Sequence, residues 1–122
     1  MKALVFVGSS REDLKSFPDD VRQDLGFALY QAQCGSKAFN VKPLKGFGGA
    51  GVLEVRADDD GNTYRAVYTV KFTAAIYVLH CFQKKSTRGI RTSLQDVELI
   101  KRRLRAAQED CLIHHGRGRH EH

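Results

Sequence analysis

The chain has 122 residues with 20 Lys or Arg and 14 Asp or Glu, which gives a formal charge of +6. This length supports one domain with a single core, and the basic balance favours a nucleic-acid or other acidic partner. The apolar run that ends at Gly8 is too short for a signal peptide or a membrane span. Three cysteines without framework spacing favour a reducing compartment. We therefore expect a cytoplasmic protein with no membrane partner.

The first third of the chain predicts a strand followed by two helices. Residues 2–7 are apolar and β-branched, which is typical of a strand. Ser9 or Ser10 can begin a short helix that ends near Phe17, and Pro18 suits the first turn of a second helix. In this second helix apolar residues recur at helical spacing until Gly35, which predicts its end there.

The remainder predicts a loop, three strands and a last helix. Residues 36–51 have little periodicity and predict a loop, and the acidic run 58–62 predicts a turn. Strands are expected over three ranges: 52–56, 63–70 and 75–83. Ser93 is a predicted N-cap for a helix with an apolar stripe of Leu94, Val97, Ile100 and Leu104.

This order of elements predicts an α+β domain over residues 1–110. We expect the helices to pack against one face of a mostly antiparallel sheet. Residues 111–122 lose periodicity and are expected to form a disordered tail.

Basic residues gather where the last predicted strand ends, at Lys84, Lys85, Arg88 and Arg91. A rigid apolar strand that ends in several fixed positive charges suits a polyanion. The alternative is a solvated charge patch, which is the usual state of Lys and Arg.

Other motifs do not indicate a cofactor. Residues 46–51 match G-x-G-x-x-G, but a loop precedes them and a strand follows, whereas a dinucleotide site needs a strand before and a helix after. We expect no metal site and no cofactor. Strict alternation places His80 on one strand face with Ile76, Val78 and Phe82, where it is either a packed histidine or a general base.

Two blocks, TYRAVY (63–68) and LHCFQKK (79–85), resemble the central strands of RelE/ParE-superfamily toxins. The longer run FQKKSTRGIR, followed by a capped helix, resembles the HigB-like, phage Gp49-like branch, and the likeness covers residues 1–107. The resemblance implies a RelE-like fold and the toxin of a type II toxin–antitoxin pair. It further implies metal-independent, ribosome-dependent cleavage of mRNA that inhibits translation, and a cognate antitoxin of the helix-turn-helix, DNA-binding kind.

The resemblance also implies roles for individual residues. Arg65 and Lys85 fall at catalytic cations of the family, and the RNA-binding positions are Arg56, Lys84, Arg88 and Arg91. In two places the sequence departs from RelE-type enzymes. Glu54 stands where they carry a lysine, and no tyrosine follows the Lys84–Lys85 pair. The candidate general bases are His80 and Glu54.

Two other functions remain open. A ParE-like protein with the same fold would inhibit DNA gyrase instead of cutting RNA. A non-catalytic RNA- or protein-binding module would bind with steep salt dependence and leave RNA intact.

Overall fold

The computed structural model describes residues 1–84 and 92–116 and has an α+β fold, as predicted. The described elements, in chain order, are β1 (Ala3–Phe6), α1 (Ser10–Lys15), α2 (Asp19–Gln33), β2 (Val41–Pro43), β3 (Val52–Asp59), β4 (Asn62–Thr69), β5 (Ala75–Lys84), α3 (Leu94–Cys111) and the π-helix η1 (Leu112–Gly116). The strands form a sheet in the order β1-β5-β4-β3-β2. Strand β1 pairs with β5 in parallel, and the other neighbours are antiparallel.

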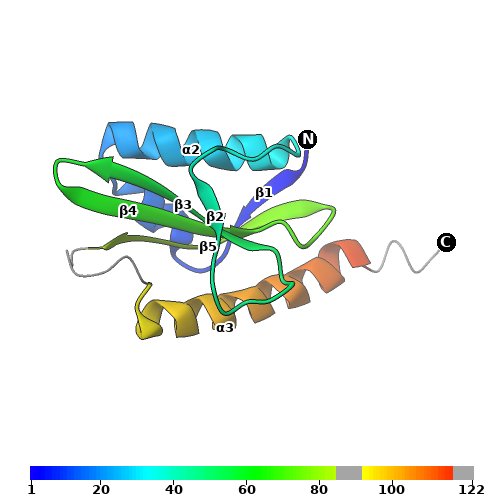
Figure 1. Ribbon diagram of the computed structural model, residues 1–122. Helices are drawn as coiled ribbons and strands as arrows, with labels where there is room; N and C mark the ends of the chain where they lie inside the picture. Colours follow the sequence, from blue (N-terminus) through cyan, green and yellow to red (C-terminus); the bar gives the residue numbers. More distant parts are fainter. Residues whose placement is uncertain (85–91, 117–122) are drawn as a thin grey trace.

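Helices cover both faces of the sheet, so the prediction that they share one face is wrong. Figure 1 shows α2 above the sheet and α3 below it. Two separate groups of buried side chains correspond to these two layers. The reason is visible in β4 and β5, whose residues are buried almost continuously, because a strand that is apolar on both faces needs a cover on each.

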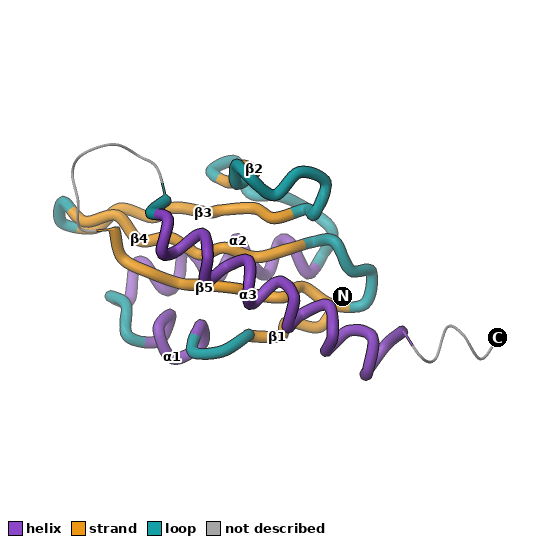
Figure 2. Tube along the Cα trace, turned by 90° about the horizontal axis from the view of Figure 1, so that it is seen from below, coloured by secondary structure: helices purple, strands orange, loops and turns teal. Residues whose placement is uncertain are grey.

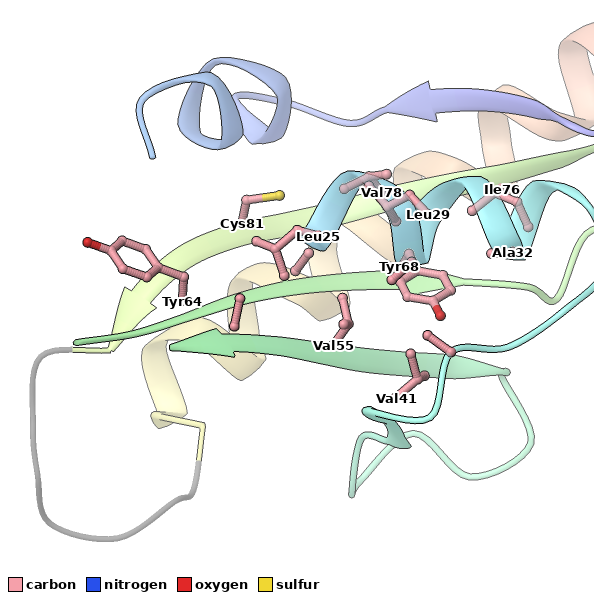
Figure 3. Close-up of a cluster of buried hydrophobic side chains, with 14 of the residues drawn as sticks. Leu25, Leu29, Ala32, Val41, Val55, Tyr64, Tyr68, Ile76, Val78 and Cys81 are labelled. Atoms are coloured by element: carbon pink, nitrogen blue, oxygen red, sulfur yellow. The ribbon is translucent and has the colours of Figure 1, made fainter. Parts of the chain in front are cut away.

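The layer between α2 and the sheet is an apolar core. Leu25 and Leu29 of α2 are fully buried against side chains of several strands. Figure 3 shows this cluster, in which the strands contribute Val41, Val55, Tyr64, Tyr68, Ile76, Val78 and Cys81. Helix α2 begins after Pro18 and is followed by Gly35 at φ +84°, so both predicted ends of this helix are confirmed.

The β3–β4 hairpin closes through a tight turn at Asp60 and Gly61. Both residues have positive φ, +50° and +80°, which suits an Asp-Gly pair in a two-residue hairpin turn. Strand β2 lies in the segment that was expected to be a loop, so that prediction is wrong for Val41–Pro43. It is an edge strand, where Pro43 costs no ladder hydrogen bond.

A β-bulge interrupts the β4–β5 ladder. Val67 pairs with His80, whereas the next residue, Tyr68, pairs with Val78, so Leu79 is the extra residue. Beyond the bulge, side chains of β5 change faces. Strict alternation would place His80 with Val78 on the α2 side, and that expectation is wrong, because His80 contacts α3.

Helix α3 has the predicted N-cap, since the Ser93 side chain accepts a hydrogen bond from the backbone N–H of Asp96. Figure 2 shows α3 crossing the sheet diagonally, from β3 at its N-terminal end toward β1. Helical structure extends beyond residue 110, through Cys111 and into η1. The division of the chain into a domain over residues 1–110 and a tail over residues 111–122 stays a prediction. None of the described helices combines the length and apolar character that crossing a bilayer requires.

Candidate functional site

A cavity of about 430 Å³ lies on the α3 side of the sheet, between the β2–β3 edge and the first turn of α3. Figure 2 shows β2, β3 and the N-terminal end of α3 close together at this edge. The described residues that line the cavity are Asn40, Lys42, Pro43, Leu44, Lys45, Glu54, Arg56, Asp58, Arg65, Thr92 and Val97. Among them, four cationic side chains face two carboxylates, so the cavity has a positive charge balance.

The deepest part of the site is an ion pair between Arg65 of β4 and Glu54 of β3. Arg65 Nη1 donates to Glu54 Oε1 at 3.0 Å and to Oε2 at 3.1 Å. The Arg65 side chain is 3% exposed and that of Glu54 is 12% exposed. Arg65 Nε is buried without a hydrogen-bond partner in the described structure. A buried guanidinium of this kind depends on its single carboxylate for compensation.

Thr92, two residues before α3, ties the same carboxylate to the helix end of the site. Its hydroxyl donates to Glu54 Oε2 at 3.0 Å. Glu54 therefore receives hydrogen bonds from a strand on one side and from the start of α3 on the other. This arrangement holds the carboxylate in one orientation at the cavity wall.

Two further predicted cations belong to this region. Arg56 lines the cavity and is directly opposite Arg65 in the β3–β4 register. Lys84, at the end of β5, is half-buried, and its pKa is lowered from the usual value of lysine. Burial is the main cause, and the nearby Arg65 and Arg56 add to it, while Glu54 acts in the opposite direction. Lys84 thus lies within electrostatic reach of the buried pair.

His80 has a different environment, and it does not line the cavity. Its Nε2 lies 2.7 Å from Asp96 Oδ1 of α3, and its ring stacks on Phe82 with 4.5 Å between centroids. Its Nδ1 is buried without a partner in the described part of the chain. Asp96 also accepts a hydrogen bond from the Ser93 hydroxyl. Through these contacts His80 connects α3 to β5, and its role as a general base stays a prediction.

Of the predicted site residues, the structure brings together Arg65, Glu54 and Arg56 at the cavity, with Lys84 beside them. The predicted Lys85, Arg88 and Arg91 lie outside the described residues. The sequence reasoning missed Thr92, Asn40, Lys42 and Lys45. A signal was present, since Lys42 and Lys45 flank a Pro-Leu pair, but without β2 nothing placed them next to β3.

The described residues contain no group of three or more His, Cys, Asp or Glu side chains that could hold a metal ion. The described lining of the cavity provides cationic side chains and the Glu54 carboxylate, which Arg65 and Thr92 orient.

The α+β fold, with its five-stranded mixed sheet, N-terminal strand and C-terminal helix, is compatible with a RelE-like fold. A family model described as phage-derived protein Gp49-like matches residues 12–105, and the chain belongs to this family. The Gp49-like family is a toxin-like family, and membership implies an antitoxin partner. No curated protein matches the chain.

Proposed function

We propose that this protein is the toxin of a bacterial toxin–antitoxin pair and that it cleaves mRNA on the ribosome without a metal ion. The observation that carries the proposal is the cation-lined cavity with the Glu54 carboxylate fixed in its wall. A positive cavity attracts the RNA backbone, and a fixed carboxylate can take a proton. Binding of the RNA backbone and removal of a proton are both needed for metal-free RNA cleavage.

The reaction is attack of a ribose 2′-hydroxyl on the adjacent phosphate. In it the 2′ oxygen bonds to phosphorus, the bond from phosphorus to the 5′ oxygen breaks, and the products are a 2′,3′-cyclic phosphate and a 5′-hydroxyl end. One group must remove the proton of the 2′-hydroxyl and another must protonate the departing 5′ oxygen. A third requirement is stabilisation of the negative charge that grows on the phosphorane.

Glu54 is the better candidate for the base of the two predicted. Its carboxylate lines the cavity, whereas His80 is committed to Asp96 through Nε2 and has its Nδ1 buried. A base must come within hydrogen-bond distance of the proton that it removes. In this proposal Arg65 and Thr92 hold Glu54 in the orientation for that transfer.

Lys84 is the proposed acid for the departing 5′ oxygen. Its pKa is lowered by burial and by the neighbouring guanidinium groups, so its ammonium gives up a proton more readily than an ordinary lysine. Arg56 and the guanidinium of Arg65 supply the charge that stabilises the phosphorane. The predicted contribution of Lys85 to the same step stays a prediction.

One observation favours a second candidate, the non-catalytic RNA- or protein-binding module. The Arg65 guanidinium is paired with the Glu54 carboxylate, and its side chain is 3% exposed. A phosphate can therefore contact Arg65 only by disturbing this ion pair. A protein of this kind would bind ribosomes or its antitoxin and leave the message intact.

The test is cleavage of a defined message, free and on translating ribosomes, with the new 5′ ends mapped. We expect ribosome-dependent cuts that disappear in Arg65→Ala, while the exposed α3 substitution Arg102→Ala cuts normally. Thermal melting shows whether each variant is folded. An intact message with tight ribosome binding would favour the binding module, and inhibition of gyrase supercoiling would favour the ParE-like function.

A further inference from the structure

The cavity has a second part that the proposed cleavage chemistry does not use. Between β2 and α3 its wall is apolar, formed by Pro43, Leu44 and Val97. Lys42 and Lys45 lie on either side of the Pro-Leu pair, and both are exposed. An apolar wall flanked by exposed cations suits a ligand with a flat apolar part and an anionic part.

We propose that this part of the cavity is a nucleotide subsite, in which the apolar wall contacts a nucleobase and Lys42 and Lys45 bind its phosphate. The inference rests on the proposed function for its ligand class, an RNA nucleotide next to the cleaved bond. It adds a base contact, which phosphate-binding cations alone do not provide.

The size of the cavity fits this ligand. Pockets for small molecules commonly measure roughly 300–1,000 Å³ and combine mostly apolar walls with a few polar groups. At about 430 Å³ the cavity lies in the lower part of this range, which suits one nucleotide better than a folded RNA element.

The wall is also held in place before any ligand binds. The backbone N–H of Leu44 donates to the carbonyl of Val52 at 3.0 Å, which fixes the residue after β2 to β3. Asn40 Nδ2 donates to the carbonyl of Arg56 at 2.9 Å, which fixes the residue before β2 to the same strand. A preformed wall spares a ligand the cost of ordering it.

The register brings the subsite next to the proposed base. Lys42 pairs with Glu54 across β2 and β3, so their side chains leave the same face of the sheet. A phosphate held by Lys42 therefore lies close to the carboxylate that Arg65 and Thr92 orient. The subsite positions the nucleotide, and Glu54 acts on it.

The experiment compares two probes on the full chain without ribosomes, adenosine 5′-monophosphate and ribose 5-phosphate, by NMR titration of backbone and methyl signals. The probes share the sugar and phosphate, so only the base differs. Burial of apolar surface contributes roughly 25 cal/mol per Å², so a base that buries about 40 Å² against this wall strengthens binding by roughly fivefold, and we expect that margin for the nucleotide. We also expect the methyl signals of Leu44 and Val97 to shift with the nucleotide alone.

Substitutions assign the two parts of the ligand. Val97→Phe fills the apolar part and should remove the advantage of the nucleotide over the sugar phosphate. Lys42→Ala with Lys45→Ala should weaken both probes, whereas Lys37→Ala, an exposed lysine outside the cavity lining, should weaken neither. Equal binding of the two probes by the wild-type chain, or shifts confined to residues outside the cavity, would overturn the subsite whether or not the variants fold.

The outcome is separable from that of the proposed function. Nucleotide binding at this wall without message cleavage would keep the subsite and reject the endonuclease. Message cleavage without preference for the nucleotide over the sugar phosphate would keep the endonuclease and reject the subsite.

Discussion

Neutralising Glu54 is the sharpest test of the chemistry at the buried pair. Glu54→Gln keeps the size of the side chain and one hydrogen-bond acceptor for Arg65, but it removes the proposed proton acceptor. A positioned general base contributes roughly 10²–10⁴-fold to a rate. We therefore expect ribosome-dependent cleavage to fall by about that factor, which corresponds to about 3–5 kcal/mol of activation free energy.

The same substitution has a cost in stability that the assay must separate from the loss of activity. Removing one partner of a buried ion pair costs about 3–5 kcal/mol, because the other charge stays buried without compensation. Glu54 is 12% exposed, and glutamine can still accept a hydrogen bond, so we expect the lower end of this range, about 3 kcal/mol. Small domains have about 5–15 kcal/mol of unfolding free energy, so the variant should remain folded at 25 °C.

Single-turnover cleavage on ribosomes, with urea unfolding in parallel, measures both effects. The matched control is Asp59→Asn, which removes a carboxylate from the same strand but outside the cavity lining, and it should cleave like the wild type. A folded Glu54→Gln variant that cleaves at the wild-type rate would refute the role of Glu54 as base. Faster cleavage would show instead that Glu54 blocks Arg65 from the phosphate.

Three further predictions concern other groups. Burial raises the pKa of the Cys81 thiol to about 12, so at pH 8 a thiol reagent should modify exposed Cys34 at once and Cys81 only on unfolding, as peptide mapping would show. Asp96→Asn weakens the contact with His80 and should cost about 1–3 kcal/mol in urea unfolding while cleavage persists; abolished cleavage in a folded variant would contradict the structural role of His80. Because the pKa of Lys84 is lowered, the cleavage rate should decline with rising pH at a lower pH than that at which an ordinary lysine loses its proton. If the pH–rate profile of the Lys84→Met variant equals that of the wild type, Lys84 is not the acid.

Local signals in the sequence were sufficient for most of the fold. Proline before α2, glycine after it and Ser93 before α3 act within a few residues, and the structure has helix ends at all three places. Strand β2 was missed because three residues with a proline give no periodicity, and what defines the strand is its pairing with β3. Short edge strands are specified by the neighbouring strand more than by their own residues.

The site was predictable in its cations but not in their partners. Arg65 and Arg56 were assigned from the resemblance, and both line the cavity. Glu54 was recognised as a departure from RelE-type enzymes, but its hydrogen bond to Arg65 was not predicted. The register places Arg65 directly opposite Arg56, so Glu54 and Arg65 meet as diagonal neighbours across β3 and β4. Thr92 reaches the same carboxylate from 38 residues away. Such contacts depend on the register and on where α3 begins, and neither can be read from spacing.

The bulge in β5 decides which charges meet. In a regular strand Lys84 would share the α2 side with Val78, because even-numbered residues would keep one face throughout. The extra residue, Leu79, moves later even-numbered residues to the α3 side, which brings Lys84 toward the Glu54–Arg65 pair. Arg103 of α3 stabilises this geometry, since its Nη1 donates to the carbonyl of Leu79 at 3.0 Å. The position of Lys84 beside the cavity thus depends on one inserted residue in an otherwise apolar strand. With strict alternation along β5, Lys84 would lie on the other face of the sheet from Glu54 and Arg65, and the proposed acid would be separated from the proposed base.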